Sequence, residues 1–554
     1  MGASNAMDRS SSRFAWLRVL ILSLVILFGG YSVILMYVNG EIAFALMTTF
    51  VLSLGIYIFT NPKTYAHRYI FPGVAGMVIF ILFPMAYTVA LSFTNYSSKN
   101  ILPLERAQDY LLKQTFKAQE GSYQASLFAA PEGKFRILLT PTEGDNTDLY
   151  MTTVVPMWDA AEIKKRGANP DLMPGVEVPH KALKVEQLPE AAAIERKVLF
   201  QYREHLRALR FELPDGKLVM ADQSAGVGNY SAVRPQYSRL DGGVVVKNTG
   251  AIISDGNTLF DNRTQKHLRP NFDIGFYQYI DENGEFVGKP LSPGFTVGIG
   301  WDNYWKVLSD PGIQQPFFQI FVWTVLFAAG SVFFTLAIGM VLANLVQWEF
   351  LRGRAIYRVM LILPYAVPAF ISILVFKGLF NQNFGEINLV LETLFGIRPD
   401  WYTSPALART MILIVNTWLG YPYMMILCMG LLKSIPEDLY EASAMDGAGP
   451  VHNFFHITIP LLMRPLTPLL IASFAFNFNN FVLIQLLTAG RPDIIGASVP
   501  AGTTDILVSY TFRIAFEGGG GQDYGLAAAI ATVIFIIVGA LAVLNLKLSK
   551  MDKV

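Results

Sequence analysis

Long apolar runs constrain the fold of this chain more than any other feature. A membrane-spanning helix needs roughly 20 mostly apolar residues. About eight stretches meet or approach this length, at residues 19–38, 41–60, 70–93, 317–346, 359–380, 406–431, 461–488 and 525–546. The chain is 53% hydrophobic and only 15% charged, which excludes a single soluble globule. We therefore expect an α-helical polytopic membrane protein with about eight transmembrane helices.

Basic residues in the short connections indicate the orientation of these helices. They gather before the first run, between the second and third, between the fourth and fifth, and after the last, as Arg9, Arg13, Arg18, Lys63, His67, Arg68, Arg352, Arg354, Arg358, Lys547, Lys550 and Lys553. Such residues favour the cytoplasmic side of a membrane. With eight spans, both termini and the loop at 434–460 are then cytoplasmic, and residues 95–305 lie outside.

The segment 95–305 is long enough to form a domain of ordinary size. Turn signals predict hairpins at 210–220, around Pro214-Asp215-Gly216, and at 276–287, around Asn283-Gly284. Short strands are expected at 244–246 and 252–253, and helices at 104–119 and 190–207. We expect an inserted, strand-rich α+β domain. It is interpreted as a platform for an extracytoplasmic partner, with an inert insertion as the alternative.

No catalytic or metal-binding motif is evident. The Gly-Lys pairs at 133–134, 216–217 and 288–289 lack the remaining residues of a phosphate-binding loop. His452 and His456 lack co-ligands and are interpreted as surface residues. With 43 basic and 42 acidic residues, nucleic acid is not expected as a partner. The single cysteine, Cys428, allows no intrachain disulfide. We expect no cofactor in this chain.

A polar segment with its own helix signals separates the sixth and seventh apolar runs. Ser434 and Glu437 form a capping-box pattern that predicts a helix start. Gly447, Gly449 and Pro450 predict its end, and a second, apolar helix follows until Pro460. Through residue 462 this second helix leads directly into the seventh run. A short helix–turn–helix at the membrane edge is typical of a docking surface.

Two apolar runs carry polar and aromatic residues at helical spacing. Ser473, Phe476, Asn477 and Asn480 share one helical face, and so do Asn416, Gly420 and Tyr423. Amides, hydroxyls and aromatic rings suit a neutral carbohydrate, because they satisfy its hydroxyl groups without charge. The alternative is that these residues only join helices through hydrogen bonds. An ion-coupled carrier would more often place carboxylates at this depth.

The motif E-A-x-x-x-D-G-A at 441–448, followed by I-x-x-P-L at 457–461, resembles the coupling loop of ABC import permeases. The runs ILPYAVPAFISILVFKGLFNQ, VNTWLGYPYMMILCMGLLKSIP and ASFAFNFNNFVLIQLLTAG resemble the maltose/maltodextrin permease subunit family, MalF. So do TNYSS at 94–98 and RIAFEGGGGQDYGLAAAIAT near the C-terminus. The resemblance extends from the first span to the last and is weakest in the outer domain.

This resemblance implies a multi-pass subunit of the bacterial inner membrane that imports maltose and maltodextrins. Its partners would be a MalG-like second permease, a homodimeric MalK-like ATPase that binds ATP and Mg²⁺, a periplasmic maltose-binding protein, and membrane lipid. Sugar-contacting positions would be Asn416, Gly420, Tyr423, Ser473, Phe476, Asn477 and Asn480. Positions that engage the ATPase would be Glu441, Ser443, Asp446 and Gly447. The family usually has Ala where this chain has Ser443.

The implied organisation is a membrane segment at 7–94, a periplasmic domain at 95–305, and a permease core at 306–554 with the coupling loop at 434–462. Residues 1–6 are typical of a cloning remnant, with a natural extension as the alternative. Three other functions remain open. They are import of a different oligosaccharide by the same mechanism, ion-coupled sugar transport, and a membrane-anchored sensor.

Overall fold

The structure is a computed structural model that describes residues 15–131, 134–142, 147–166, 173–174, 176, 178–187, 192–222, 224–240, 244–245, 252–253, 256–348, 350–518 and 521–551. The expectation for residues 1–6 lies outside these ranges. The chain forms two compact units. One, Lys99–Val297, is an insertion in the other, which consists of Met1–Ser98 and Gly298–Val554.

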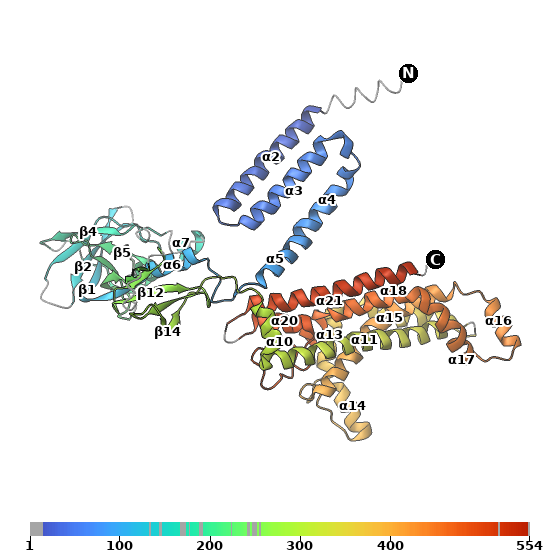
Figure 1. The fold of residues 1–554 in the computed structure, drawn as a ribbon. Coiled ribbons are helices and arrows are strands. Elements are labelled where there is room, and N and C mark those ends of the chain that lie inside the picture. Colours follow the sequence, from blue (N-terminus) through green and yellow to red (C-terminus); the bar gives the residue numbers. More distant parts are fainter. Residues whose placement is uncertain are drawn as a thin grey trace, which may run out of the picture. The chain divides into compact units, whose positions relative to one another are not determined.

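The larger unit is helical (Figure 1). Within the described residues, seven helical segments are long and apolar enough to cross a membrane, and one bent pair would make eight. The seven are α2 (Ala15–Val38), α3 (Ile42–Thr60), α4–η2–α5 (His67–Met77, Val78–Leu82, Phe83–Leu91), α11 (Pro311–Gln347), α15 (Pro405–Leu432), α17–η6–α18 (Pro450–Asn453, Phe454–Thr458, Ile459–Phe478) and α21 (Tyr524–Met551). This confirms the predicted fold class.

Two predicted spans are broken. The span at 359–380 is divided into α12 (Arg354–Ala366) and α13 (Ala369–Leu379), which are bent by 91°. Val367 is extended there because the ring of Pro368 disfavours a helical residue before it. The span at 461–488 ends at Phe478, and Asn480 starts the short helix α19 (Phe481–Leu487). The crossing helix therefore begins and ends earlier than predicted.

Small residues bring α11 and α15 close together. A Cβ atom on Gly339 would lie 2.7 Å from Cβ of Met424, and one on Gly420 would lie 2.8 Å from Cγ2 of Thr335. In a membrane such small residues allow tight helix packing, which replaces the hydrophobic driving force. The helices α10 (Asp302–Ser309), α18 and α20 (Leu507–Phe516) pack against this pair, and α21 packs against α18 and α20. The unit also contains the short helices α14 (Glu386–Phe395) and α16 (Asp438–Met445).

The inserted unit is rich in strands. A closed barrel contains β1 (Thr115–Ala130), β2 (Lys134–Pro141), β3 (Leu149–Thr152), β4 (His180–Val185), β5 (Arg210–Glu212), β6 (Leu218–Ala221) and β7 (Asn229–Pro235). A second sheet has the order β14 (Phe286–Leu291), β13 (Phe276–Ile280), β12 (Lys266–Asn271), β11 (Leu259–Asp261) and β8 (Tyr237–Arg239). The strands β9 (Val244–Val245) and β10 (Ile252–Ile253) pair separately.

The hairpins predicted in this unit are confirmed, because β5 pairs with β6 and β13 with β14, both antiparallel. The helix predicted at 104–119 is only partly correct. The helix α6 spans Leu104–Leu112, and from Thr115 the chain belongs to β1, which pairs with both β2 and β7. Closing the barrel needs that strand, and its backbone pairing outweighs local helix propensity. The helix predicted at 190–207 is divided into α8 (Arg196–Leu199) and α9 (Arg203–Ala208).

Candidate functional site

A buried cluster of polar side chains joins three membrane-spanning helices. Asn416 on α15 donates through Nδ2 to Oγ of Ser331 on α11 and to Oδ1 of Asn477 on α18, both at 2.8 Å. Nδ2 of Asn480 donates in turn to Oδ1 of Asn416 at 3.3 Å. We call Ser331, Asn416, Asn477 and Asn480 the amide cluster. Its bonds satisfy polar groups that would be costly to leave unpaired among apolar helices.

Local backbone contacts fix the orientation of the cluster. Nδ2 of Asn477 donates to the carbonyl oxygen of Ser473 one turn earlier, at 2.8 Å. Oδ1 of Asn480 accepts from the backbone N–H of Leu483 where the helix breaks. Oγ1 of Thr335 donates to the carbonyl oxygen of Ser331 at 2.6 Å. The cluster is therefore held by its own helices as well as by the contacts between them.

The predicted sugar-contacting residues fall into three groups, and Ser473 and Gly420 form the third. Ser473 is half-buried, and its backbone carbonyl oxygen accepts from Asn477. Asn416, Asn477 and Asn480 are brought together in the cluster. Phe476 is 71% exposed and Tyr423 is 40% exposed in this chain, so their rings are free to meet another molecule. Gly420 lies at the contact between α11 and α15, against Thr335. The structure thus shows interhelical hydrogen bonding for the asparagines, which is the alternative interpretation of their pattern.

Ser331 and Thr335 were not singled out from the sequence. Both are buried on α11. Their signal is a pair of hydroxyl residues at i and i+4 inside the fourth apolar run, which places them on one helical face. Such a pair is a weaker signal of bonding between helices than three asparagines, because a hydroxyl group can bond within its own helix.

The loop between α15 and α18 starts differently from the prediction. Oγ of Ser434 donates to the carbonyl oxygen of Leu431 at 2.6 Å and caps no helix, so the predicted capping box is wrong. The helix α16 begins only at Asp438, without a side-chain cap. Pro436 explains the delay, because a residue before proline is disfavoured in helical conformation.

The predicted turn of this loop is present. Gly447 has φ +80°, a conformation that glycine adopts without strain, and α16 ends just before it. Glu441 and Asp446 are exposed. Oγ of Ser443 donates to Oδ1 of Asn453 at 2.6 Å, which bonds the first helix of the loop to the second. The hydroxyl groups of Tyr440 and Thr458 lie 2.9 Å apart and add a second link.

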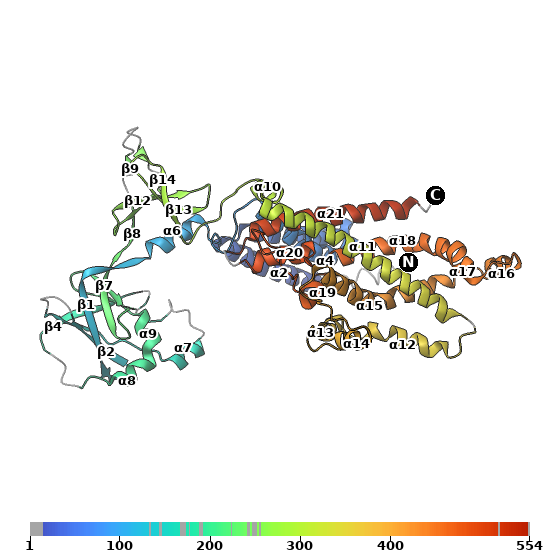
Figure 2. The ribbon, with the colours of Figure 1, turned by 90° about the horizontal axis from the view of Figure 1, so that it is seen from below.

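The second helix of the loop continues into the membrane. Pro460 was expected to end it, but Pro460 lies in the first turn of α18, and the π-helical turn η6 connects α17 to α18. A π turn inside an α-helix is rare and often marks a functional site. The loop and Asn477 therefore share one helical segment, Pro450–Phe478. Figure 2 shows α16 and α17 at one end of the helical unit.

A buried ion network was missed by the sequence analysis. Arg513 on α20 contacts Asp505 (Nη1–Oδ2, 3.0 Å), Asp493 (Nη2–Oδ1, 2.6 Å) and Glu517 (Nε–Oε2, 3.0 Å). The side chain of Arg513 is 6% exposed and that of Asp505 is fully buried. Asp505 also accepts from the N–H of Gly502 and from Oγ of Ser509, each at 2.7 Å. The positions of these four charged residues in the sequence follow, as a set, neither helix nor strand periodicity, so no local pattern predicts the network.

Separate hydrogen bonds connect the segment 490–505 to the long helices. Nε1 of Trp323 on α11 donates to the carbonyl oxygen of Thr504 at 3.3 Å. Nε of Arg409 on α15 donates to the carbonyl oxygen of Thr503 at 2.9 Å, and its guanidinium group lies over the ring of Trp323. The segment is therefore hydrogen-bonded to both α11 and α15.

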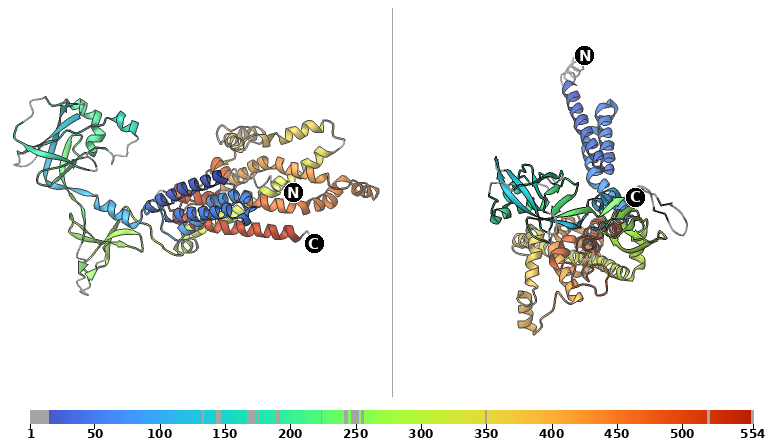
Figure 3. Two further views of the ribbon diagram at one scale, coloured as in Figure 1. Left: turned by 90° about the horizontal axis from the view of Figure 1, so that it is seen from above. Right: turned by 90° about the vertical axis from the view of Figure 1, so that its left-hand side faces the viewer.

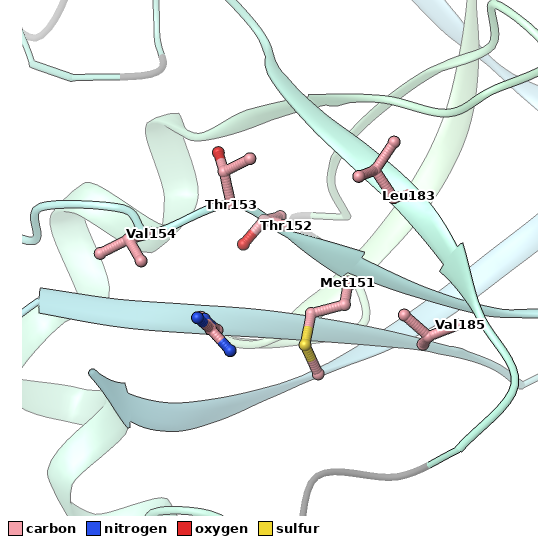
Figure 4. Close-up of a pocket in the computed structure, with 7 residues that line it drawn as sticks. Met151, Thr152, Thr153, Val154, Leu183 and Val185 are labelled. Atoms are coloured by element: carbon pink, nitrogen blue, oxygen red, sulfur yellow. The ribbon is translucent and has the colours of Figure 1, made fainter. Parts of the chain in front are cut away.

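The inserted barrel carries an open pocket of about 380 Å³ (Figure 4). Apolar and hydroxyl side chains line it, namely Met151, Thr152, Thr153, Val154, Leu183 and Val185, together with Arg136. No group of three or more metal-ligating side chains occurs in the described parts of the chain. His452 and His456 stack with ring centroids 4.0 Å apart, without a carboxylate or cysteine group that would complete a metal site.

Three family models match successive parts of the chain. Residues 16–63 match the N-terminal transmembrane helices of MalF, and residues 102–300 match the P2 domain of the maltose transport system permease protein MalF. Residues 335–548 match the binding-protein-dependent transport system inner membrane component. Between them these matches cover the N-terminal helices, the insertion and the helical core.

Curated relatives with the name maltose/maltodextrin transport system permease protein MalF are similar over nearly the whole chain. The protein of Vibrio cholerae is 53% identical over 98% of this chain and 97% of its own. Those of Klebsiella aerogenes and Escherichia coli K12 are 55% and 53% identical, each over 96% of both chains. The chain therefore belongs to the MalF family of binding-protein-dependent transport system inner-membrane permeases.

Proposed function

We propose that this chain is the permease subunit of an ATP-driven importer that carries maltose and maltodextrins across the inner membrane. Support comes from the full-length similarity to relatives with that name and from the helical architecture. Under this proposal, both termini and the loop at 434–462 face the cytoplasm, and the inserted domain faces the periplasm.

The partners follow from the same proposal. A MalG-like permease would complete the membrane pathway, and its contact would cover part of the apolar surface that this chain leaves exposed. A homodimeric MalK-like ATPase would bind ATP and Mg²⁺, so hydrolysis would take place outside this chain. A periplasmic maltose-binding protein would dock on the inserted domain and deliver sugar.

The observation that carries the proposal is the continuity of Pro450–Phe478, which connects the exposed coupling loop to the amide cluster. Glu441, Ser443, Asp446 and Gly447 would engage the ATPase. Because Ser443 and Tyr440 bond to the second helix, a displacement of α16 would be passed to α18 rather than absorbed in the turn. The movement would then reach Asn477 and its neighbours.

At the membrane midplane the same segment would present the sugar-contacting face. The exposed rings of Phe476 and Tyr423 would stack on the apolar faces of the sugar. Ser473, Asn480 and Gly420 would border this site. Asn416 and Asn477 would fix the positions of α15 and α18 in the sugar-free state, and could offer their amides to sugar only if the helices separate.

The test is Phe476→Ala in the full transporter. We expect maltose uptake to fall at least tenfold with normal assembly, because an exposed ring contributes little to folding but much to stacking. The matched control is Phe478→Ala, which removes a ring that is 1% exposed. Phe478→Ala should lower the thermal stability of the complex. Wild-type uptake with Phe476→Ala would refute the assigned sugar site.

A further inference from the structure

We propose that Arg352, Arg354 and Arg358 form a binding site for the headgroup of an anionic phospholipid. The three arginines lie in the connection between α11 and α12 and in the first turns of α12. Figures 2 and 3 show this yellow connection at the same end of the helical unit as the orange coupling loop. At this end of the unit, Nε2 of Gln347 on α11 donates a 2.8 Å hydrogen bond to the carbonyl oxygen of Met429 on α15, which holds the two helices together.

The positive charge of this site is not compensated by the described residues. No hydrogen bond or ion pair joins the three guanidinium groups to any residue that the structure describes. Residues 350–385 contain no Asp or Glu, and the nearest acidic residue in the sequence is Glu349, which lies outside the described residues. Nε of Arg358 is buried without a hydrogen-bond partner. The side chains of Arg352 and Arg354 are exposed and that of Arg358 is partly exposed, so a phosphate group can form charge-assisted hydrogen bonds with these guanidinium groups.

The helix backbone places two of the three guanidinium groups on one side of α12. Gly353 adopts φ +75° and starts α12, so that Arg354 and Arg358 lie one turn apart on the same face. The first N–H groups of α12 add positive potential at this end. The hydroxyl of Tyr421 on α15 donates to the carbonyl oxygen of Leu361 at 3.1 Å, which fixes α12 against its neighbour.

The surrounding side chains favour a lipid over a protein partner. Exposed aromatic rings flank the arginines, with Trp348 at 59%, Phe350 at 84% and Tyr357 at 50% exposure. Aromatic rings beside basic residues at the end of a span are typical of the membrane–water interface. Further along α12 the exposed side chains are apolar, including Val359, Met360 and Leu363, and they suit acyl chains below the headgroup.

The test is native mass spectrometry of the full-length chain, purified in detergent with its co-purifying subunits and titrated with phosphatidylglycerol or phosphatidylcholine. We expect preferential binding of phosphatidylglycerol. Arg354→Gln and Arg358→Gln should each weaken this binding about fivefold, since a basic residue near an anionic lipid surface contributes about that factor. The matched control, Arg464→Gln on α18, should change it less than twofold. Co-purification and melting temperature verify that each variant is folded.

Several outcomes would overturn the proposal. Equal affinity for the two lipids, or unchanged phosphatidylglycerol binding in Arg354→Gln and Arg358→Gln, would exclude a headgroup site at these arginines. Displacement of the lipid by millimolar inorganic phosphate would indicate a site for free phosphate. Loss of a co-purifying subunit from these variants with unchanged lipid binding would assign the arginines to a protein contact.

Discussion

The side-chain amide of Asn416 donates a 2.8 Å hydrogen bond to Oδ1 of Asn477, across 61 residues of chain. The two helices it joins are the two that flank the coupling loop, because α15 leads into the loop and α18 leaves it. A movement of the loop therefore acts on both partners of this bond. The presence or absence of this bond therefore reports the position of α15 relative to α18.

The first prediction concerns the strength of this bond. In a double-mutant cycle with Asn416→Ala and Asn477→Ala, we expect a coupling energy of about 0.5–1.5 kcal/mol in unfolding of the purified protein. The control cycle combines Asn416→Ala with Asn479→Ala. Among the described residues, Nδ2 of Asn479 bonds only to the carbonyl oxygen of Ala475 on its own helix, so those effects should add. Additivity in both cycles would show that the cluster does not bind the helices together.

The second prediction concerns the hydrogen bond between Ser443 and Asn453, which joins the two helices of the coupling loop and which we call the brace. Asn453→Ala removes the acceptor of the 2.6 Å bond from Oγ of Ser443, so the loop can bend without moving α18. We expect less maltose transported per ATP hydrolysed, with ATPase activity retained. The control is Ser434→Ala in the same loop. Within the described parts of the chain this hydroxyl bonds only to the carbonyl oxygen of Leu431, so its removal should leave the ratio unchanged. Equal ratios in the two variants would contradict a role for the brace.

The third prediction concerns the contact between α11 and α15. In Gly420→Ala the new Cβ would lie 2.8 Å from Cγ2 of Thr335, so we expect a loss of about 1–3 kcal/mol in stability. Gly430→Ala on the same helix meets no atom within 4 Å and should be neutral or stabilising. Thr335→Ser removes the opposing methyl group and should restore much of the stability of Gly420→Ala. Failure of that rescue would show that this contact is not the cause.

The fourth prediction concerns the buried ion network. Asp505→Ala leaves Arg513 buried without its main partner, which should cost about 3–5 kcal/mol in unfolding free energy. Asp493→Ala removes a carboxylate that is 60% exposed and should cost less than about 1 kcal/mol. Thermal unfolding of the purified variants measures both. Similar small losses would show that Arg513 finds another partner.

The fifth prediction concerns pH and the inserted domain. The ring of His205 is buried, accepts at Nδ1 from the N–H of Trp158 at 2.8 Å, and donates from Nε2 to the carbonyl oxygen of Pro174 at 2.9 Å. Burial lowers the pKa of His205 in the folded domain. The unfolded chain then binds the proton more tightly, so stability is complete above the ordinary histidine pKa of about 6.5 and falls below it.

The measurement for this pH effect is hydrogen exchange of the Trp158 amide in the full-length protein. Its protection should decrease between about pH 7.5 and pH 5.5, because a protonated Nδ1 cannot accept its hydrogen bond. In His205→Gln the change with pH should be much smaller. An equal loss of protection in that variant would assign the effect to other groups.

Local sequence patterns are sufficient to predict the helical membrane class, the inserted strand-rich domain and the position of the coupling loop. These follow from local quantities: the length of apolar runs, turn residues such as Asn283-Gly284, and the glycine that ends α16. Each depends on a few neighbouring residues and on the solvent that surrounds them. They could therefore be predicted from short stretches of the chain.

The partners of the polar residues and the positions of the helix breaks depend on tertiary contacts. The pattern of Asn416, Asn477 and Asn480 allowed either sugar contact or bonding between helices, and only the approach of α11 revealed Ser331 as the fourth member of the cluster. The pairing of Arg513 with Asp505 depends on the fold of a loop without periodicity. At 104–119 barrel closure outweighed helix propensity. In each case the deciding energy comes from groups that meet only after folding, and no local pattern records them.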